Sequence, residues 1–177
     1  MSRVAFSTGL TVVLAFCLGG CNPARDTFDH VQTTRPTAKM ERLTVGVGEP
    51  IEVTLATAFG LPEQSQVPER SIKGIVMSAC FGTDIAPSNS LNNAGGYCDP
   101  NESDTPPAWI TLTDGSSHVL DVPDVVVKRG QEETVEHTFS LTRNEPGEVV
   151  IAPTLYYTAE GDGPAFVSGA YLTVTFE

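Results

Sequence analysis

Short segments in which apolar and polar residues alternate make up most of the chain beyond about residue 42. The clearest lies between Gln131 and Glu145, where Val135, Phe139 and Leu141 share one parity and polar residues, mostly threonine and glutamate, occupy the other. A period of two is typical of a β-strand with one buried and one solvated face. This segment is therefore predicted to be a half-buried strand.

The same alternation, or a short apolar run, predicts further strands, and clusters of Gly, Pro, Asn and Asp separate them. The predicted segments are Leu43–Val47, Ile51–Leu55, Ile72–Phe81, Trp109–Thr113, Val119–Val127, Val149–Tyr157 and Leu172–Phe176. No segment between them favours a helix long enough to connect parallel strands. We therefore expect an all-β domain over residues 42–177, an antiparallel β-sandwich of about seven to nine strands.

The C-terminal part of this domain resembles the last three strands of an immunoglobulin-like or fibronectin type III-like domain. The resemblance covers Glu132 onwards, through Pro146–Thr158 to Tyr171–Glu177. It implies an immunoglobulin-like sandwich, in which Tyr156 or Tyr157 is a candidate for the tyrosine at the corner between two strands. The sequence departs from true immunoglobulin domains because its cysteines are too close for the usual bridge between sheets, and its tryptophan follows both of them.

The N-terminus has the layout of a secretory signal. Arg3 precedes an apolar run of about 15 residues, Val4–Leu18, whereas a membrane-spanning helix needs roughly 20. Leu18-Gly19-Gly20-Cys21 then resembles the lipobox of bacterial lipoproteins. Cys17 follows the bulky Phe16 and does not fit that pattern. Residues 1–20 are therefore expected to be a lipoprotein signal peptide.

The lipobox resemblance implies that Cys21 becomes the first residue and carries a lipid that anchors the protein to a membrane. Several acyl chains give stable attachment where one chain gives only marginal binding. Asn22, in place of an aspartate, favours the outer membrane of the cell envelope, with the domain facing the periplasm or the exterior. Residues 21–41 are expected to form a flexible tether, with a short helix near 26–31 as an alternative. A plain cleaved signal with a free Cys21 is the alternative to lipidation.

Two cysteines, Cys80 and Cys98, remain in the mature domain. An even number in an oxidising compartment predicts a disulfide. The bridge would close a loop of about 19 residues, for which the chain-entropy model gives a stabilisation of roughly 3 kcal/mol.

The formal net charge of −12 excludes some classes of partner. Nucleic acid carries a dense negative charge, so it is not expected as a ligand. Anionic lipid headgroups would also repel the chain, which leaves the covalent anchor on Cys21 as the expected means of membrane attachment.

The candidate chemistry is sparse, because none of the familiar catalytic or nucleotide-binding motifs occurs. His118 and His137 could bind a metal or transfer protons, although a structural role for half-buried histidines is the expected one. Asp99, Asn101, Glu102 and Asp104 offer oxygen ligands for Ca²⁺, with a solvated acidic loop as the alternative. Tyr97, within the 82–107 loop, and Trp109, just after it, could stack on a sugar or contact a protein, unless Trp109 fills the core.

These observations together favour a non-enzymatic envelope lipoprotein whose domain contacts another envelope protein or supports an envelope assembly. A surface module that binds carbohydrate or Ca²⁺ is the second hypothesis. An uncharacterised hydrolase-type enzyme is the third. No cofactor is expected apart from the Ca²⁺ of the second hypothesis.

Overall fold

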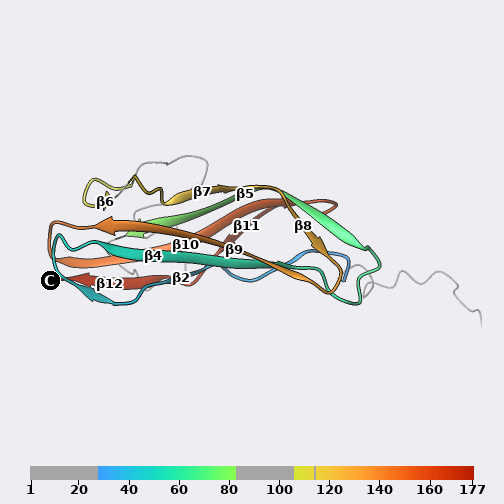
Figure 1. The fold of residues 1–177 in the computed structure, drawn as a ribbon, viewed down its shortest axis with the longest axis horizontal. Coiled ribbons are helices and arrows are strands. Elements are labelled where there is room, and N and C mark those ends of the chain that lie inside the picture. Colours follow the sequence, from blue (N-terminus) through green and yellow to red (C-terminus); the bar gives the residue numbers. More distant parts are fainter. Residues whose placement is uncertain (1–27, 83–105, 114) are drawn as a thin grey trace, which may run out of the picture.

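The computed structural model describes residues 28–82, 106–113 and 115–177. Within these residues the chain forms two packed β-sheets and no helix, so the predicted β-sandwich is confirmed (Figure 1). The described residues contain no helix suited to crossing a membrane. The strands are β1 (Gln32–Thr33), β2 (Thr37–Lys39), β3 (Thr44–Val45), β4 (Ile51–Gly60), β5 (Glu69–Gly82), β6 (Thr111–Leu112), β7 (Val119–Val122), β8 (Val125–Lys128), β9 (Glu132–Thr142), β10 (Gly147–Ala159), β11 (Gly163–Ser168) and β12 (Leu172–Phe176).

The first sheet, sheet A, is built on β4 and β9, which pair antiparallel over their length; β1 and β2 both pair with the other edge of β4, and β6 pairs with β9. The second sheet, sheet B, has the order β3-β12-β10-β5-β7, with β11 on β10 and β8 on β5. The pairing of β4 with β9, and of β5, β10 and β12 in sequence, resembles the B–E and C–F–G arrangement of immunoglobulin domains. β3 runs parallel to β12, so sheet B is mixed and not purely antiparallel.

The core lies between the sheets and contains the residues whose parity marked them as inward-facing. Val135, Phe139 and Leu141 of β9 are buried, as predicted. On β4, Val53 pairs with Phe139 and Leu55 with His137, and both are fully buried as well. The largest fully buried side chains are Phe59, Phe139, Phe176, Leu55, Leu61, Ile72, Ile75, Met77, Leu141, Ile151, Leu155 and Val53.

A bulge in β5 keeps its side chains in register with the core. Ile72 and Ile75 both face inward although they are three positions apart, an odd spacing, and the pairing with β10 shifts between Tyr156 and Thr158. Gly74 supplies the extra residue with a φ of 57°, a left-handed conformation that glycine adopts without a Cβ penalty.

Pro153 stands in the middle of the long strand β10, where a proline normally costs a ladder hydrogen bond. The edge of β10 changes partner at this point, since β12 pairs as far as Ile151 and β11 begins at Thr154. No described strand therefore requires an N–H at Pro153 on that edge. Its carbonyl still accepts a 2.8 Å hydrogen bond from the amide of Gly169.

Several predicted segments differ from the observed ones. The run Val119–Val127 is divided into β7 and β8, because Pro123 interrupts the pairing with β5. Trp109–Thr113 contributes only the two residues of β6. Val45 is buried in β3, but Leu43 and Val47, which share its parity, are exposed because the strand is only two residues long.

The N-terminal segment differs most from the prediction, because residues 28–41 do not form a free tether. β1 and β2 pair with β4, and Pro36 is buried. Asp29 accepts hydrogen bonds from the amide of Gln66 and the hydroxyl of Ser65, at 2.7 and 3.0 Å. The folded part of the described chain therefore begins at residue 28, and not at the expected residue 42.

Candidate functional site

The site residues predicted from the sequence are only partly covered by the structure. Cys21, Tyr97, Cys98, Asp99, Asn101, Glu102 and Asp104 lie outside the described residues, so lipidation, the calcium loop and one half of the disulfide stay predictions. Cys80 is buried in β5, with 7% of its surface exposed, on the outer face of sheet B. Trp109, His118 and His137 are described.

Trp109 packs partly buried against the core, just before β6. The guanidinium carbon of Arg143 lies 5.2 Å from the centre of its ring, a cation–π contact. Arg143 also donates from Nη1 to the carbonyl of Glu148 at 3.1 Å. These contacts favour the core alternative for Trp109 over a flat ring held open to a sugar.

His118 and His137 lie on the two sides of an aromatic contact that joins the sheets. His118 is 3% exposed, and its ring lies 5.5 Å from that of Phe81 in β5. His137 is half-buried, with its ring 5.9 Å from that of Phe139 in β9. Phe81 and Phe139 meet edge to face at 6.1 Å. The histidines thus extend a line of packed rings across the sandwich.

Hydrogen bonding at His137 also supports a structural role. Its Nε2 donates to the carbonyl of Ser117 at 2.6 Å, and this contact holds the segment before β7 against β9. The described residues contain no group of three or more His, Cys, Asp or Glu side chains placed to hold a metal ion. The contacts that are shown at these two histidines serve packing and loop attachment.

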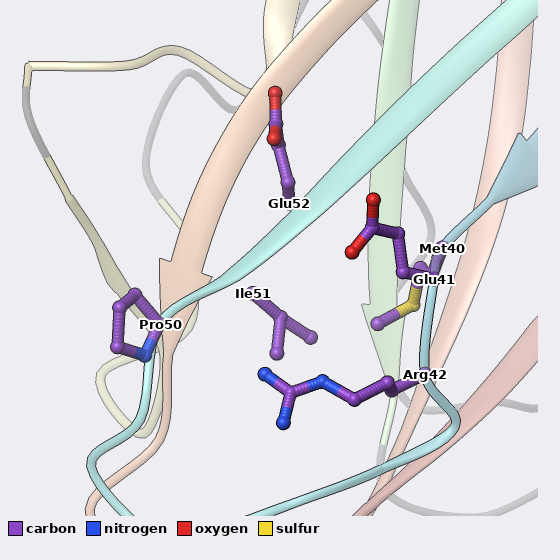
Figure 2. A pocket seen from close by; sticks show the side chains of 6 residues that line it. All are labelled: Met40, Glu41, Arg42, Pro50, Ile51 and Glu52. Carbon is purple, nitrogen blue, oxygen red and sulfur yellow. The ribbon is translucent and has the colours of Figure 1, made fainter.

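Two neighbouring hollows lie around the start of β4. The first, of about 180 Å³, lies between the segment after β2 and the beginning of β4, and Figure 2 shows the Ile51 side chain directed toward Arg42 while Glu52 points away. Its lining residues are Met40, Glu41, Arg42, Pro50, Ile51 and Glu52. The second, of about 470 Å³, is wide open and shares Pro50–Glu52. Its further lining residues are Thr113, Ser116, Thr138, Phe139 and Ser140.

The charges beside the first hollow are engaged with one another. Arg42 donates from Nη2 to Glu49 at 2.5 Å, and the amide of Gly46 donates to the other carboxylate oxygen at 3.2 Å. These hydrogen bonds from Arg42 and Gly46 lower the pKa of Glu49 below its ordinary value. The residues that line the two hollows include no histidine, cysteine or lysine, and their hydroxyl groups belong to Thr113, Ser116, Thr138 and Ser140.

A third surface, which sequence reasoning did not find, is an apolar row on the outer face of sheet B. The pairing register places Phe166 of β11 beside Tyr156 of β10, and Tyr156 beside Val76 of β5. Phe166 is 48% exposed, and Tyr156 and Val76 are half-buried. Asp121 of β7 ends the row. We call Phe166, Tyr156 and Val76 the aromatic row.

The aromatic row had no signal in the sequence, because its members come from three strands whose register only the fold defines. Tyr156 alternates with buried residues in β10, and Phe166 alternates with half-buried residues in β11, so both fall on what would be the solvent face. Exposed aromatic side chains that gather on one face of a soluble domain commonly mark contact surfaces.

Comparisons with known proteins do not place the chain in a family. No family model and no curated protein matches it. Among solved structures, it is similar to the sporulation control protein Spo0M of Bacillus subtilis, with 13% sequence identity and a TM-score of 0.35. The match covers 81% of this chain and 49% of Spo0M, so the chain spans about half the length of that protein. A likeness at this level carries no argument about function.

Proposed function

We propose that this protein is a lipid-anchored component of the bacterial cell envelope whose immunoglobulin-like domain binds another envelope protein without catalysing a reaction. The observation that carries the proposal is the aromatic row of Phe166, Tyr156 and Val76 on the outer face of sheet B. Aromatic residues are enriched among the side chains that contribute most to protein–protein binding.

The surroundings of the row suit a protein partner. Pro164 precedes Phe166 on the same face of β11 and is exposed. Lys73 and Asp121 lie beside the row on β5 and β7, and both are exposed. An apolar centre with charged residues at its margin is the usual anatomy of a protein interface.

The anchor is supported by the lipobox of Leu18-Gly19-Gly20-Cys21, and the fold limits where the domain would lie. Seven residue steps separate Cys21 from Phe28, the first described residue, and a chain of that length spans about 25 Å at most, whatever its conformation. The domain would therefore stay close to the membrane surface, in place of standing off on a tether of about 20 residues.

The short distance that the segment between Cys21 and Phe28 can span also sets which end of the domain would face the membrane. Asp29 is bound to the β4–β5 connection through Gln66 and Ser65, and the ring of His30 is hydrogen-bonded to Asp162 in the β10–β11 turn. The end of the sandwich that holds these turns would thus face the bilayer. The C-terminal residue Glu177, whose carbonyl accepts from Val47, lies at the opposite end, marked C in Figure 1.

Site-specific crosslinking in cells of the native host tests the partner. A photoreactive phenylalanine analogue replaces Phe166 in the full chain, and the matched control carries it at Tyr171, an aromatic residue that is 50% exposed outside the row. We expect a discrete crosslinked protein band from position 166, absent or much weaker from position 171. Equal labelling at both positions, or no protein band from position 166 under several growth conditions, would overturn the proposal.

A further inference from the structure

Among the described strands, β9 has a long edge that is mostly unpaired, which we call the open edge, in contrast to the other margins of the two sheets. It pairs with β4 without a bulge, from Leu141 opposite Ile51 to Glu132 opposite Gly60. On its other side only Thr142 and Leu141 pair with a described strand, the two-residue β6. The stretch from Glu132 to Thr138 has no strand partner among the described residues.

Hydrogen bonds at Ser140 show which backbone groups face this open edge. The hydroxyl of Ser116 accepts from the amide of Ser140 at 3.2 Å and donates to its carbonyl at 3.0 Å. Both groups of Ser140 therefore point away from β4. Because alternate residues of an antiparallel strand direct their N–H and C=O to the same side, Thr138, Glu136 and Thr134 present theirs to the open edge.

Other edge strands are short or interrupted, which is how native sheets avoid unwanted pairing. β1, β2, β3, β7, β8 and β11 have between two and six residues each. Pro36 separates β1 from β2, and Pro123 separates β7 from β8. The open part of β9 contains no proline, glycine or lysine, and Thr134, Glu136 and Thr138 are all exposed.

The charge along this edge selects the kind of partner. Glu132, Glu133 and Glu136 are exposed, and β9 contains no lysine or arginine. A second copy of the chain would bring like charges together, and each copy carries a net charge of −12. Opposite charges across paired strands stabilise the pair, and like charges destabilise it.

We propose that the open edge of β9 receives an extended, basic segment of another protein as an added strand. The amides and carbonyls of Thr134, Glu136 and Thr138 supply the main-chain hydrogen bonds, and the glutamates pair with lysine or arginine of the segment. The inference rests on the proposed role in protein contact and adds to it a second site with a defined ligand chemistry.

Amide hydrogen exchange of the full chain tests this directly. The probe is a seven-residue peptide in which lysine alternates with valine, and the control peptide has the same sequence with alternate amides N-methylated. In the free protein we expect slow exchange at Val135 and His137, whose amides face β4, and fast exchange at Thr134 and Glu136. The unmodified peptide slows exchange at Thr134 and Glu136 at least tenfold, and the methylated peptide does not.

Two variants separate the backbone contribution from the charge. Glu136→Pro removes a donor that faces the open edge and leaves the ladder with β4 intact, so it weakens peptide binding at least tenfold. Glu136→Lys keeps the backbone and reverses one exposed charge, so it weakens binding several-fold, whereas Glu148→Lys on β10 does not. The comparison of Glu136→Lys with Glu148→Lys keeps the test valid if the proline variant does not fold.

The outcomes that overturn the inference are distinct from those that overturn the proposed function. Equal binding of the two peptides would mean attraction by charge alone, and concentration-dependent protection of Thr134 and Glu136 without peptide would mean that a second copy occupies the edge. Either result would overturn the proposal that a basic segment of another protein pairs with β9. Neither affects crosslinking at Phe166, which lies on the other sheet.

Discussion

The hydroxyl of Thr33 in β1 donates a 2.8 Å hydrogen bond to the phenolic oxygen of Tyr157 in β10. The two residues belong to different sheets and lie 124 positions apart in the sequence. Tyr157 is 7% exposed, and its ring meets that of Phe59 edge to face at 5.1 Å. This bond fastens the N-terminal segment across the sandwich. Tyr157 lies near the end of β10 and not at the strand's beginning, where a corner tyrosine would be.

Tyr157→Phe removes the phenolic oxygen and keeps the ring. We expect a loss of about 1 kcal/mol in the free energy of unfolding, the usual net value of one hydrogen bond. Thr33→Val should cost a similar amount, and the double variant little more than either. Urea unfolding measures all three, with Tyr171→Phe as the exposed control. Additive losses from the two changes would show that the bond does not form.

The lowered pKa of Asp29 predicts that the stability of the fold decreases at acid pH. The hydrogen bond from the Gln66 amide, with those from Ser65 and Val67 and the charge of Arg70, lowers its pKa below the ordinary 3.8. A carboxyl whose pKa is lower in the folded than in the unfolded protein stabilises the fold. This stabilisation is fully present at a pH above the unfolded-state pKa, and it is lost as the pH falls through the folded-state pKa.

Urea unfolding between pH 6 and pH 2 should therefore show a weaker acid dependence for Asp29→Asn than for the unchanged protein. Titration followed by NMR should place the pKa of the Asp29 carboxyl below 3.8, and Ser65→Ala should move it upward. A pKa at or above the ordinary value would contradict the hydrogen bonding described here.

Gly169 should tolerate no side chain. A Cβ at this position would lie 1.8 Å from the carbonyl oxygen of Pro36 and 2.7 Å from Cγ of Pro153. Because one obstacle is backbone, Gly169→Ala should cost about 3 kcal/mol through overpacking. Gly60→Ala is the matched control, since its Cβ would meet only ordinary contacts at 3.9 Å and beyond. Similar midpoints of thermal unfolding for the two variants would refute the close approach of Pro36.

Membrane attachment should depend on the sulfur of Cys21. Cys21→Ser is expected to move the protein from the membrane fraction to the soluble fraction, or to leave it with its signal peptide uncleaved. Mass spectrometry of the unchanged protein should show an acylated N-terminal peptide beginning at Cys21. An unmodified thiol at that position would remove the anchor from the proposed function.

Cys80 and Cys98 should be bonded to each other in the mature protein. Alkylation under non-reducing conditions is expected to label neither, and reduction to make both available. Opening a loop of this length should lower the free energy of unfolding by roughly 3 kcal/mol. A free thiol at Cys80 in protein purified without reductant would contradict the pairing.

The sequence predicted those parts of the fold that depend on local alternation. β9 is one example, and the first half of β4, in which Glu52 and Thr54 alternate with buried residues, is another. It did not predict that β10 is buried on both faces, with Val150 and Ala152 shielded as well as Val149 and Ile151. Shielding of the outer face depends on what lies over the sheet, which alternation does not encode.

The N-terminal segment was assigned incorrectly to the tether for a related reason. Residues 28–41 are polar and contain Pro36, a composition typical of linkers. Their order comes from contacts with distant residues, such as those of Asp29 with Gln66 and of Thr33 with Tyr157. The aromatic row escaped prediction similarly, because it exists only once β11, β10 and β5 are in register.

The parallel pairing of β3 with β12 has a consequence for how the protein folds. Thr44 lies opposite Thr175, so this pairing joins segments from the two ends of the described chain, more than a hundred residues apart. Contacts between such distant positions slow folding. Until β12 is in place, β3 has no partner among the described strands and the edge of β10 from Gly147 to Ile151 is unpaired, so a partly folded chain would offer an open strand edge to other chains.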